Sequence, residues 1–142
     1  MKKTIIFLSL LNFFGCANKQ KELKYLMCKD SIQYWNYEWP RERAQYYGFT
    51  FSLNKDGNLK KYSFDKVENK RRYFWDIPDP SVNRWSVSKD SILKIMGDKE
   101  KITKYTEDTI YVISLEDKTK SYYVRVKGNL NIDKEPITKT DL

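Results

Sequence analysis

The sequence contains no histidine, and this absence removes several classes of active site. Histidine-dependent catalytic triads, HExxH zinc sites and histidine pH switches are all excluded. Cysteine is nearly absent too: Cys16 and Cys28 form neither a CxxC pair nor a Cys-rich zinc site. No G-x-S-x-G motif supplies a serine nucleophile. We therefore predict a protein that is not an enzyme and that needs no cofactor or metal.

The chain also has no apolar run long enough to span a membrane as a helix. Its longest apolar stretch, Thr4 to Gly15 ("TIIFLSLLNFFG"), is uncharged, whereas a spanning helix needs about 20 residues. Lys2 and Lys3 precede this stretch. A basic start followed by a short apolar run is typical of a secretory signal peptide, which we predict over residues 1–15. A buried helix or strand is the alternative interpretation.

Gly15-Cys16, at the end of that stretch, resembles a bacterial lipobox, in which the cysteine is lipidated and becomes the mature N-terminus. The sequence departs from the usual pattern at Phe13, where an aliphatic residue is normal, and at Phe14, which is larger than usual. The resemblance implies acyl chains such as palmitate on Cys16, and anchoring by more than one chain is stable. A Cys16–Cys28 disulfide is the competing use of this thiol.

The segment after Cys16 bears on location. Ala17-Asn18 lacks the aspartate that retains lipoproteins at an inner membrane, by resemblance to known sorting signals, and "ANKQKE" lacks a dense acidic run. In a cell with two membranes, this predicts an envelope lipoprotein of the outer membrane, facing the periplasm. We interpret residues 16–30 as the lipidated cysteine and a Lys-rich tether. Within it, "KELKYLMC" is compatible with a short helix that places Leu23, Leu26 and Met27 on one face.

From Ser31 onward, apolar and polar residues alternate with the period of two that is typical of strands. Asp56-Gly57 is a strong hairpin signal, and later strands are separated by turns of two to four residues, which favours antiparallel neighbours. Pro78 and Pro80 exclude a central strand in the irregular stretch 65–83. We predict an all-β, antiparallel up-and-down meander over residues 31–127. About eight strands are expected to close into a barrel, with an open sandwich as the alternative and a polar tail over 128–142.

The order of these features is similar to that of the lipocalin-like domains of small bacterial lipoproteins. The matching stretches are the hairpin "FSLNKDGNL" at Phe51 to Leu59, "WSVSKDSILKI" at Trp85 to Ile95, and "ITKYTEDTIYV" at Ile102 to Val112. This resemblance implies a lipocalin-like β-barrel with an interior cavity. It carries over no functional residues, because these motifs are folding signals.

Aromatic residues make up 15% of the chain, and one group suggests a binding surface. Trp35, Tyr37 and Trp39 share a face of one predicted strand, and Trp85 lies on another. Such rings could stack on a sugar or line an apolar ligand site, whereas packing in the barrel core is the alternative. The carboxylate pairs in "DIPDP" and "EDKT" are interpreted as turn residues rather than as an acid/base pair.

The chain is basic, with a net charge of +8. The loop "KVENKRRYFWDIPDP" combines Arg71, Arg72 and Trp75, and conspicuous loops often carry function, so we consider it a partner-binding loop. The sequence favours a lipid-anchored, non-catalytic binding module of the cell envelope, with a small apolar or glycan ligand. The alternative is a protein-interaction role with an envelope partner, as an inhibitor, immunity protein or accessory subunit. Nucleic acid is not expected as a partner.

Overall fold

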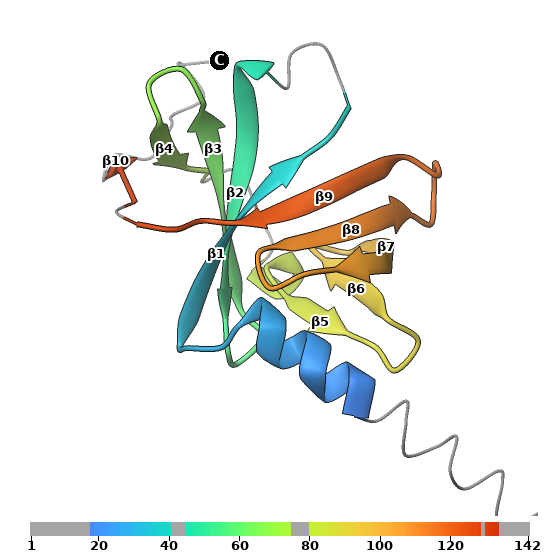
Figure 1. Ribbon diagram of the computed structural model, residues 1–142. Helices are drawn as coiled ribbons and strands as arrows, with labels where there is room; N and C mark the ends of the chain where they lie inside the picture. The colour runs from blue at the N-terminus through green and yellow to red at the C-terminus, as the bar shows by residue number, and fades with distance from the viewer. Residues whose placement is uncertain (1–17, 41–44, 75–79, 129, 134–142) are drawn as a thin grey trace, which may run out of the picture.

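The structure is a computed structural model that describes residues 18–40, 45–74, 80–128 and 130–133 (Figure 1). A helix covers residues 18–27, and the rest is almost entirely strand. The strands are β1 (Ile32–Glu38), β2 (Tyr47–Asn54), β3 (Leu59–Asp65), β4 (Lys70–Tyr73), β5 (Trp85–Val87), β6 (Ile92–Ile95), β7 (Asp98–Tyr105), β8 (Thr109–Ser114), β9 (Lys120–Arg125) and β10 (Ile132–Asp133), with a 3-10 turn η2 (Pro80–Val82) before β5.

All ten strands belong to one sheet, in the order β10-β4-β3-β2-β1-β9-β8-β7-β6-β5. Strands that pair and follow one another in the chain are antiparallel, and β1 pairs with both β2 and β9. The sheet curls into a half-barrel, as Figure 1 shows. The prediction of an all-β meander is therefore confirmed. The strand number differs from the expected eight because short β4 and β10 add a parallel pair at one edge.

Closure of the barrel is only partial. Among the described residues, the two sides of the sheet meet through one bridge, Asn58 to Arg84, just before β3 and β5. Beside this bridge, the backbone N–H of Trp85 donates to the Gly57 carbonyl at 2.9 Å. Gly57 has a φ of +89°, which confirms the hairpin turn that the Asp-Gly pair predicted. The strands thus meet at this one turn instead of forming a continuous ladder around a closed barrel.

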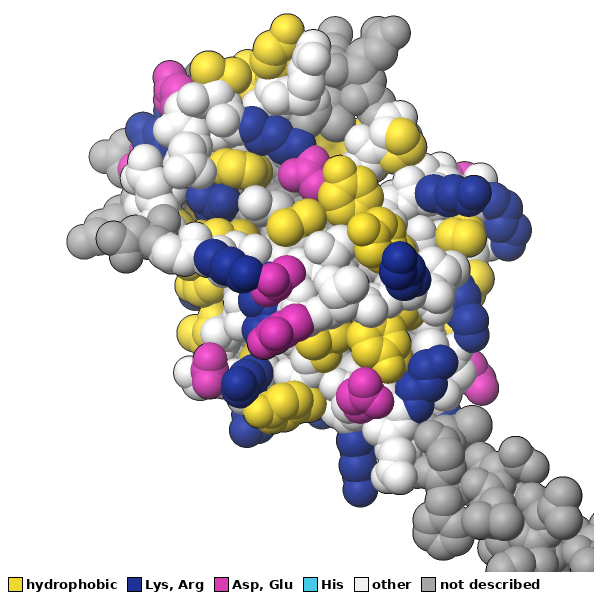
Figure 2. Space-filling model, in the orientation of Figure 1, with side chains coloured by type: hydrophobic (Ala, Val, Ile, Leu, Met, Phe, Trp, Pro, Cys, Tyr) yellow, Lys and Arg dark blue, Asp and Glu magenta, His cyan; other side chains and the backbone are white. Residues whose placement is uncertain are grey.

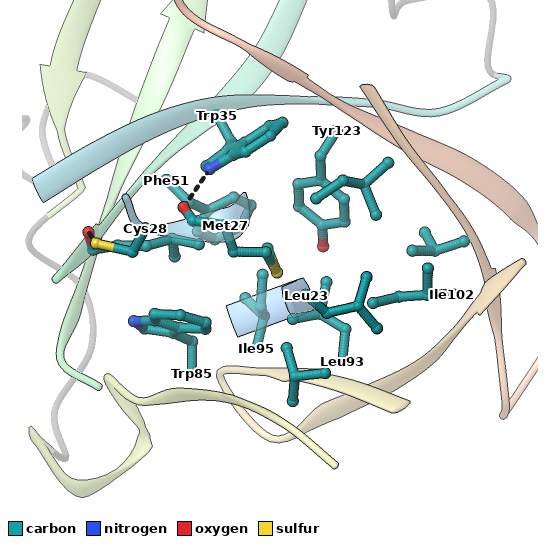
Figure 3. Packing of buried hydrophobic residues seen from close by; sticks show 14 of the residues in the cluster. Leu23, Met27, Cys28, Trp35, Phe51, Trp85, Leu93, Ile95, Ile102 and Tyr123 are labelled. Atoms are coloured by element: carbon teal, nitrogen blue, oxygen red, sulfur yellow. Dashed lines mark hydrogen bonds between the residues drawn. The ribbon is translucent and has the colours of Figure 1, made fainter. Parts of the chain in front are cut away.

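The helix closes one end of the half-barrel, below the sheet in Figure 1. Leu23 and Met27 are fully buried and point into the same core as Trp35 (Figure 3). The indole N–H of Trp35 donates to the Met27 carbonyl at 2.8 Å. The segment expected to be a tether is therefore, over residues 18–27, a packed part of the fold. The helical face proposed from Leu23, Leu26 and Met27 is confirmed, with Leu26 packed at the edge of the core.

The irregular stretch 65–83 contains more structure than the sequence suggested. Residues 70–73 form β4, which pairs with β3. Trp75 and Pro78 lie outside the described residues. Pro80 begins the short turn η2, in agreement with its exclusion from a central strand.

Candidate functional site

A cleft of about 300 Å³ lies at the end of the half-barrel opposite the helix. Its walls come from the end of β1 (Tyr37, Trp39), the start of β2 (Phe49), the start of β7 (Asp98, Lys99, Glu100) and the β8–β9 turn (Ser114, Glu116, Asp117, Thr119). At the other end of β7, the Tyr105 hydroxyl donates to Glu22 of the helix at 3.0 Å. The cleft and the helix therefore lie at opposite ends of the fold.

Three rings form an aromatic wall on one side of the cleft. The Trp39 ring lies 5.6 Å from Tyr37 and 5.5 Å from Phe49, centroid to centroid, with interplanar angles of only 27° and 20°. Alternation along β1 places Tyr37 and Trp39 on the same face, and pairing between β1 and β2 puts Phe49 directly opposite Tyr37. Half-buried, near-parallel rings of this kind offer a surface to a flat apolar face of a ligand.

Carboxylates provide the other side of the cleft. Asp98, Glu116 and Asp117 are exposed at its rim. The Thr119 backbone N–H donates to Asp117 at 3.0 Å, and such hydrogen bonds lower the pKa of this carboxyl to about 2. The carboxylate pair in "EDKT" is thus confirmed as a turn, and that turn forms one lip of the cleft. The rim groups accept hydrogen bonds and repel anions.

Glu100 forms the polar floor of the cleft and is itself buried. The Tyr123 hydroxyl donates to its Oε2 at 2.7 Å. The Tyr37 hydroxyl lies 3.3 Å from its Oε1 and 3.0 Å from Ser121 Oγ. Burial raises the pKa of Glu100, while the two tyrosine hydrogen bonds oppose that shift. Tyr37 therefore contributes its ring to the aromatic wall and its hydroxyl to the floor.

Lys61 approaches the aromatic wall from inside the half-barrel. Its Nζ lies 3.8 Å from the centroid of the Phe49 ring and 5.2 Å from that of Phe74. Burial lowers the pKa of this ammonium, and the negative charge of Asp98 opposes the shift. The inner edge of the wall is thus already occupied by a cation, which leaves its cleft side for the ligand.

The four aromatic residues predicted as ligand contacts divide into two pairs. Tyr37 and Trp39 line the cleft. Trp35 is completely buried and Trp85 retains 3% exposure, so neither lines it. The Trp85 indole N–H donates to the Asn54 carbonyl at 2.8 Å, just as Trp35 bonds to Met27. These two tryptophans hold the helix and the β2–β3 hairpin in place, which corrects the expectation that they contact a ligand.

The residues of the predicted partner-binding loop differ in exposure: Arg71 is buried, whereas Val67, Glu68 and Arg72 are exposed. Arg71 is only 2% exposed, and its guanidinium lies 3.9 Å from the Phe64 ring centroid while its Nε donates to Thr50 Oγ1 at 2.9 Å. It is therefore a structural residue. The exposed Arg72 lies 3.9 Å from the carboxylate of Asp133. Trp75 is outside the described residues.

The structure describes one of the two cysteines, Cys28. Cys28 is buried, forms no disulfide, and its thiol lies 3.2 Å from the Leu53 carbonyl. Burial raises the pKa of Cys28, so this thiol is a packing group rather than a nucleophile. Cys16 lies outside the described residues, and its lipidation stays a prediction.

Sequence reasoning missed Phe49, Asp98, Glu100 and Glu116 as members of this site. Glu100 is buried because β7 starts at Asp98, which makes Glu100 its second inward position. One signal was present: Glu100 alternates with Ile102 on the inward face.

Comparisons with known proteins leave the site to be interpreted from its geometry alone. No protein-family model matches the chain, and neither a curated protein nor a solved structure matches it. Within the described part of the chain, no helix is long and apolar enough to cross a membrane. The same residues contain no cluster of three or more His, Cys, Asp or Glu side chains that could hold a metal ion.

Proposed function

We propose that the protein is a lipid-anchored, non-catalytic binding module of the cell envelope, of lipocalin-like type, and that it holds a glycan in the cleft at the open end of the half-barrel. The observation that carries this proposal is the wall of Tyr37, Trp39 and Phe49 facing the carboxylates at the rim. Sugar rings present C–H groups that pack on aromatic faces and hydroxyl groups that donate to carboxylates.

The charge of the cleft distinguishes between the two ligand classes suggested by the sequence. Asp98, Glu116 and Asp117 are exposed at the rim. Lys99 is the one lysine among the residues that line the cleft, and Lys61 interacts with Asp98 from inside the half-barrel. An apolar ligand would desolvate these carboxylates without supplying hydrogen-bond donors in return, which is unfavourable. A fatty acid would add a further negative charge. A neutral or amino sugar satisfies the same groups, so we favour a glycan.

The protein-interaction alternative stays a proposal and loses one of its motivating residues, Arg71. Its motivation was the basic loop, but Arg71 is buried and Arg72 is close to Asp133. The placement of the cleft agrees with anchoring at Cys16, because the described chain begins with the helix, at the end of the fold far from the cleft. An anchor preceding the helix attaches the fold at the end opposite the cleft, and the location we propose is the outer membrane, on its periplasmic side.

A glycan array followed by calorimetric titration tests the proposal. We expect binding of a sugar ligand by the wild-type chain and a loss of about tenfold or more in Trp39→Ala, because aromatic contacts contribute about 0.5–1.5 kcal/mol beyond area burial. Tyr122→Ala, which removes an exposed ring outside the cleft, is the matched control and retains binding. Equal loss in both variants, or no binding to any glycan, contradicts the proposal.

A further inference from the structure

The outward face of β6–β9 combines lysines with partly exposed apolar side chains. The lysines are Lys94, Lys99, Lys101, Lys104 and Lys120, and the apolar residues are Ile92, Tyr111, Ile113, Tyr122 and Val124. We call this set the lysine–tyrosine face. Figure 2 shows dark blue and yellow side chains together over the region of β7–β9.

Strand register brings these residues together. Tyr111 lies directly opposite Tyr122 and also opposite Lys104. The two tyrosine rings are 5.9 Å apart, and the Lys104 Nζ lies 5.8 Å from the Tyr111 ring. A bulge between Ile102 and Lys104 shifts the alternation of β7, so that Lys104 points outward with Lys101. Both rings are about 40% exposed (40% for Tyr111 and 41% for Tyr122).

Ion pairs do not neutralise the charge on this face, although Lys99 lies at the acidic rim of the cleft and the Lys101 ammonium donates to the Asp90 carbonyl. None of the outward positions of β6–β9 carries a carboxylate, and no described carboxylate forms an ion pair with the five lysines. Lys94 even lies directly opposite Lys99 in the ladder. Like charges directly opposite one another destabilise a sheet. Folding alone does not favour this arrangement, whereas an anionic surface does.

We infer that the lysine–tyrosine face docks onto an anionic lipid bilayer. A lysine near an anionic bilayer surface contributes about 1 kcal/mol, and tyrosine is enriched at the membrane–water interface. In addition, Lys104 precedes Tyr105, which bonds to the helix at Glu22. The face therefore adjoins the end of the fold at which the described chain starts, and docking places the cleft's rim beside the bilayer rather than against it.

Vesicle binding tests this inference with the full-length chain carrying Cys16→Ser, so that no acyl chain contributes. The probes are vesicles of phosphatidylcholine alone and of an equal mixture of phosphatidylcholine and phosphatidylglycerol. We expect preference for the mixed vesicles, weakened by salt, and a loss of at least about tenfold in the triple variant Lys94→Glu, Lys104→Glu, Lys120→Glu.

The matched control reverses the same number of charges at exposed lysines elsewhere, Lys29→Glu, Lys55→Glu and Lys89→Glu, and is expected to keep most of the binding. If the first triple variant fails to fold, Lys→Gln at the same positions gives a smaller loss in the same direction. Equal loss in both triple variants, or no preference for mixed vesicles, overturns the inference. Binding of duplex DNA or polyglutamate through these lysines without vesicle binding overturns it as well.

Discussion

The hydroxyl of Tyr123 donates a 2.7 Å hydrogen bond to the buried carboxyl of Glu100, and this pair forms the boundary between the hydrophobic core and the cleft. It joins β9 to β7, and Tyr37 extends the contact to β1. The aliphatic core and the helix lie on one side of this pair, and the aromatic wall and the rim carboxylates lie on the other. The polar floor thus fixes the strands that carry the cleft.

Tyr123→Phe removes this hydrogen bond while keeping the ring. We expect the free energy of unfolding to fall by about 1.5–3 kcal/mol, because a buried polar group then lacks its closest partner. Tyr122→Phe, which alters an exposed ring on the same strand, is expected to change it by less than about 0.5 kcal/mol. Denaturant titration measures both, and similar values for the two variants would contradict this role for Tyr123.

The pH dependence of stability follows from the raised pKa of Glu100. Burial raises this pKa above its ordinary value of 4.5. Between pH 4.5 and the higher native pKa, Glu100 is therefore protonated in the native state and ionised in the unfolded chain. The carboxyl therefore lowers the free energy of unfolding above its native pKa, and the penalty disappears as the pH falls below 4.5.

Glu100→Gln removes this titration and keeps an acceptor for Tyr123. We expect its stability relative to wild type to increase from acidic to neutral pH, measured by denaturant titration at several pH values. A difference between Glu100→Gln and wild type that is constant with pH would show that Glu100 has no raised pKa.

Leu23→Ala tests whether the helix belongs to the fold. Leu23 is fully buried, so its truncation is expected to lower the free energy of unfolding by about 2–5 kcal/mol. Lys24→Ala, at an exposed neighbouring position, is expected to have an effect within about 0.5 kcal/mol. If Leu23→Ala is equally harmless, residues 18–27 act as a tether after all.

Arg71→Ala is expected to destabilise the fold by about 2–4 kcal/mol, because it removes the donor to the Thr50 hydroxyl and one of the two donors to Asn36 Oδ1, and it uncovers Phe64. Arg71→Lys restores little of this loss, since an ammonium cannot reproduce the planar guanidinium contacts. Arg72→Ala is the neighbouring control and is expected to be nearly neutral. A glycan titration of folded Arg71→Lys is expected to match wild type, which separates this residue from the cleft.

Much of the fold could be predicted because local signals and tertiary packing agree. Alternation predicted the strands that contain Trp35, Phe51 and Tyr62. Asp56-Gly57 predicted the hairpin turn between the strands of Phe51 and Tyr62. The helix was identified only from the spacing of Leu23 and Met27; its burial depends on an open barrel end that no local pattern reveals. The parallel pairing of β10 with β4 joins residues about sixty positions apart, so it leaves no local signal either.

The site was harder to predict because its members are separated along the chain. Alternation correctly placed Tyr37 and Trp39 on one face, but the same pattern placed Trp35 there, and only depth within the barrel separates core from cleft. Arg71 is basic and lies in a basic run, which suggests exposure. Its burial follows from pairing with β3 and from the Phe64 ring, both of which are tertiary features.

The most direct test of the central claim is an NMR titration that follows the tryptophan indole N–H signals as the glycan is added. Trp39→Phe assigns the Trp39 signal. The account predicts that this signal shifts with ligand, whereas the signals of Trp35 and Trp85, which are bonded to backbone carbonyls in the core, stay in place. An unchanged Trp39 signal during saturable binding would contradict a ligand site in this cleft.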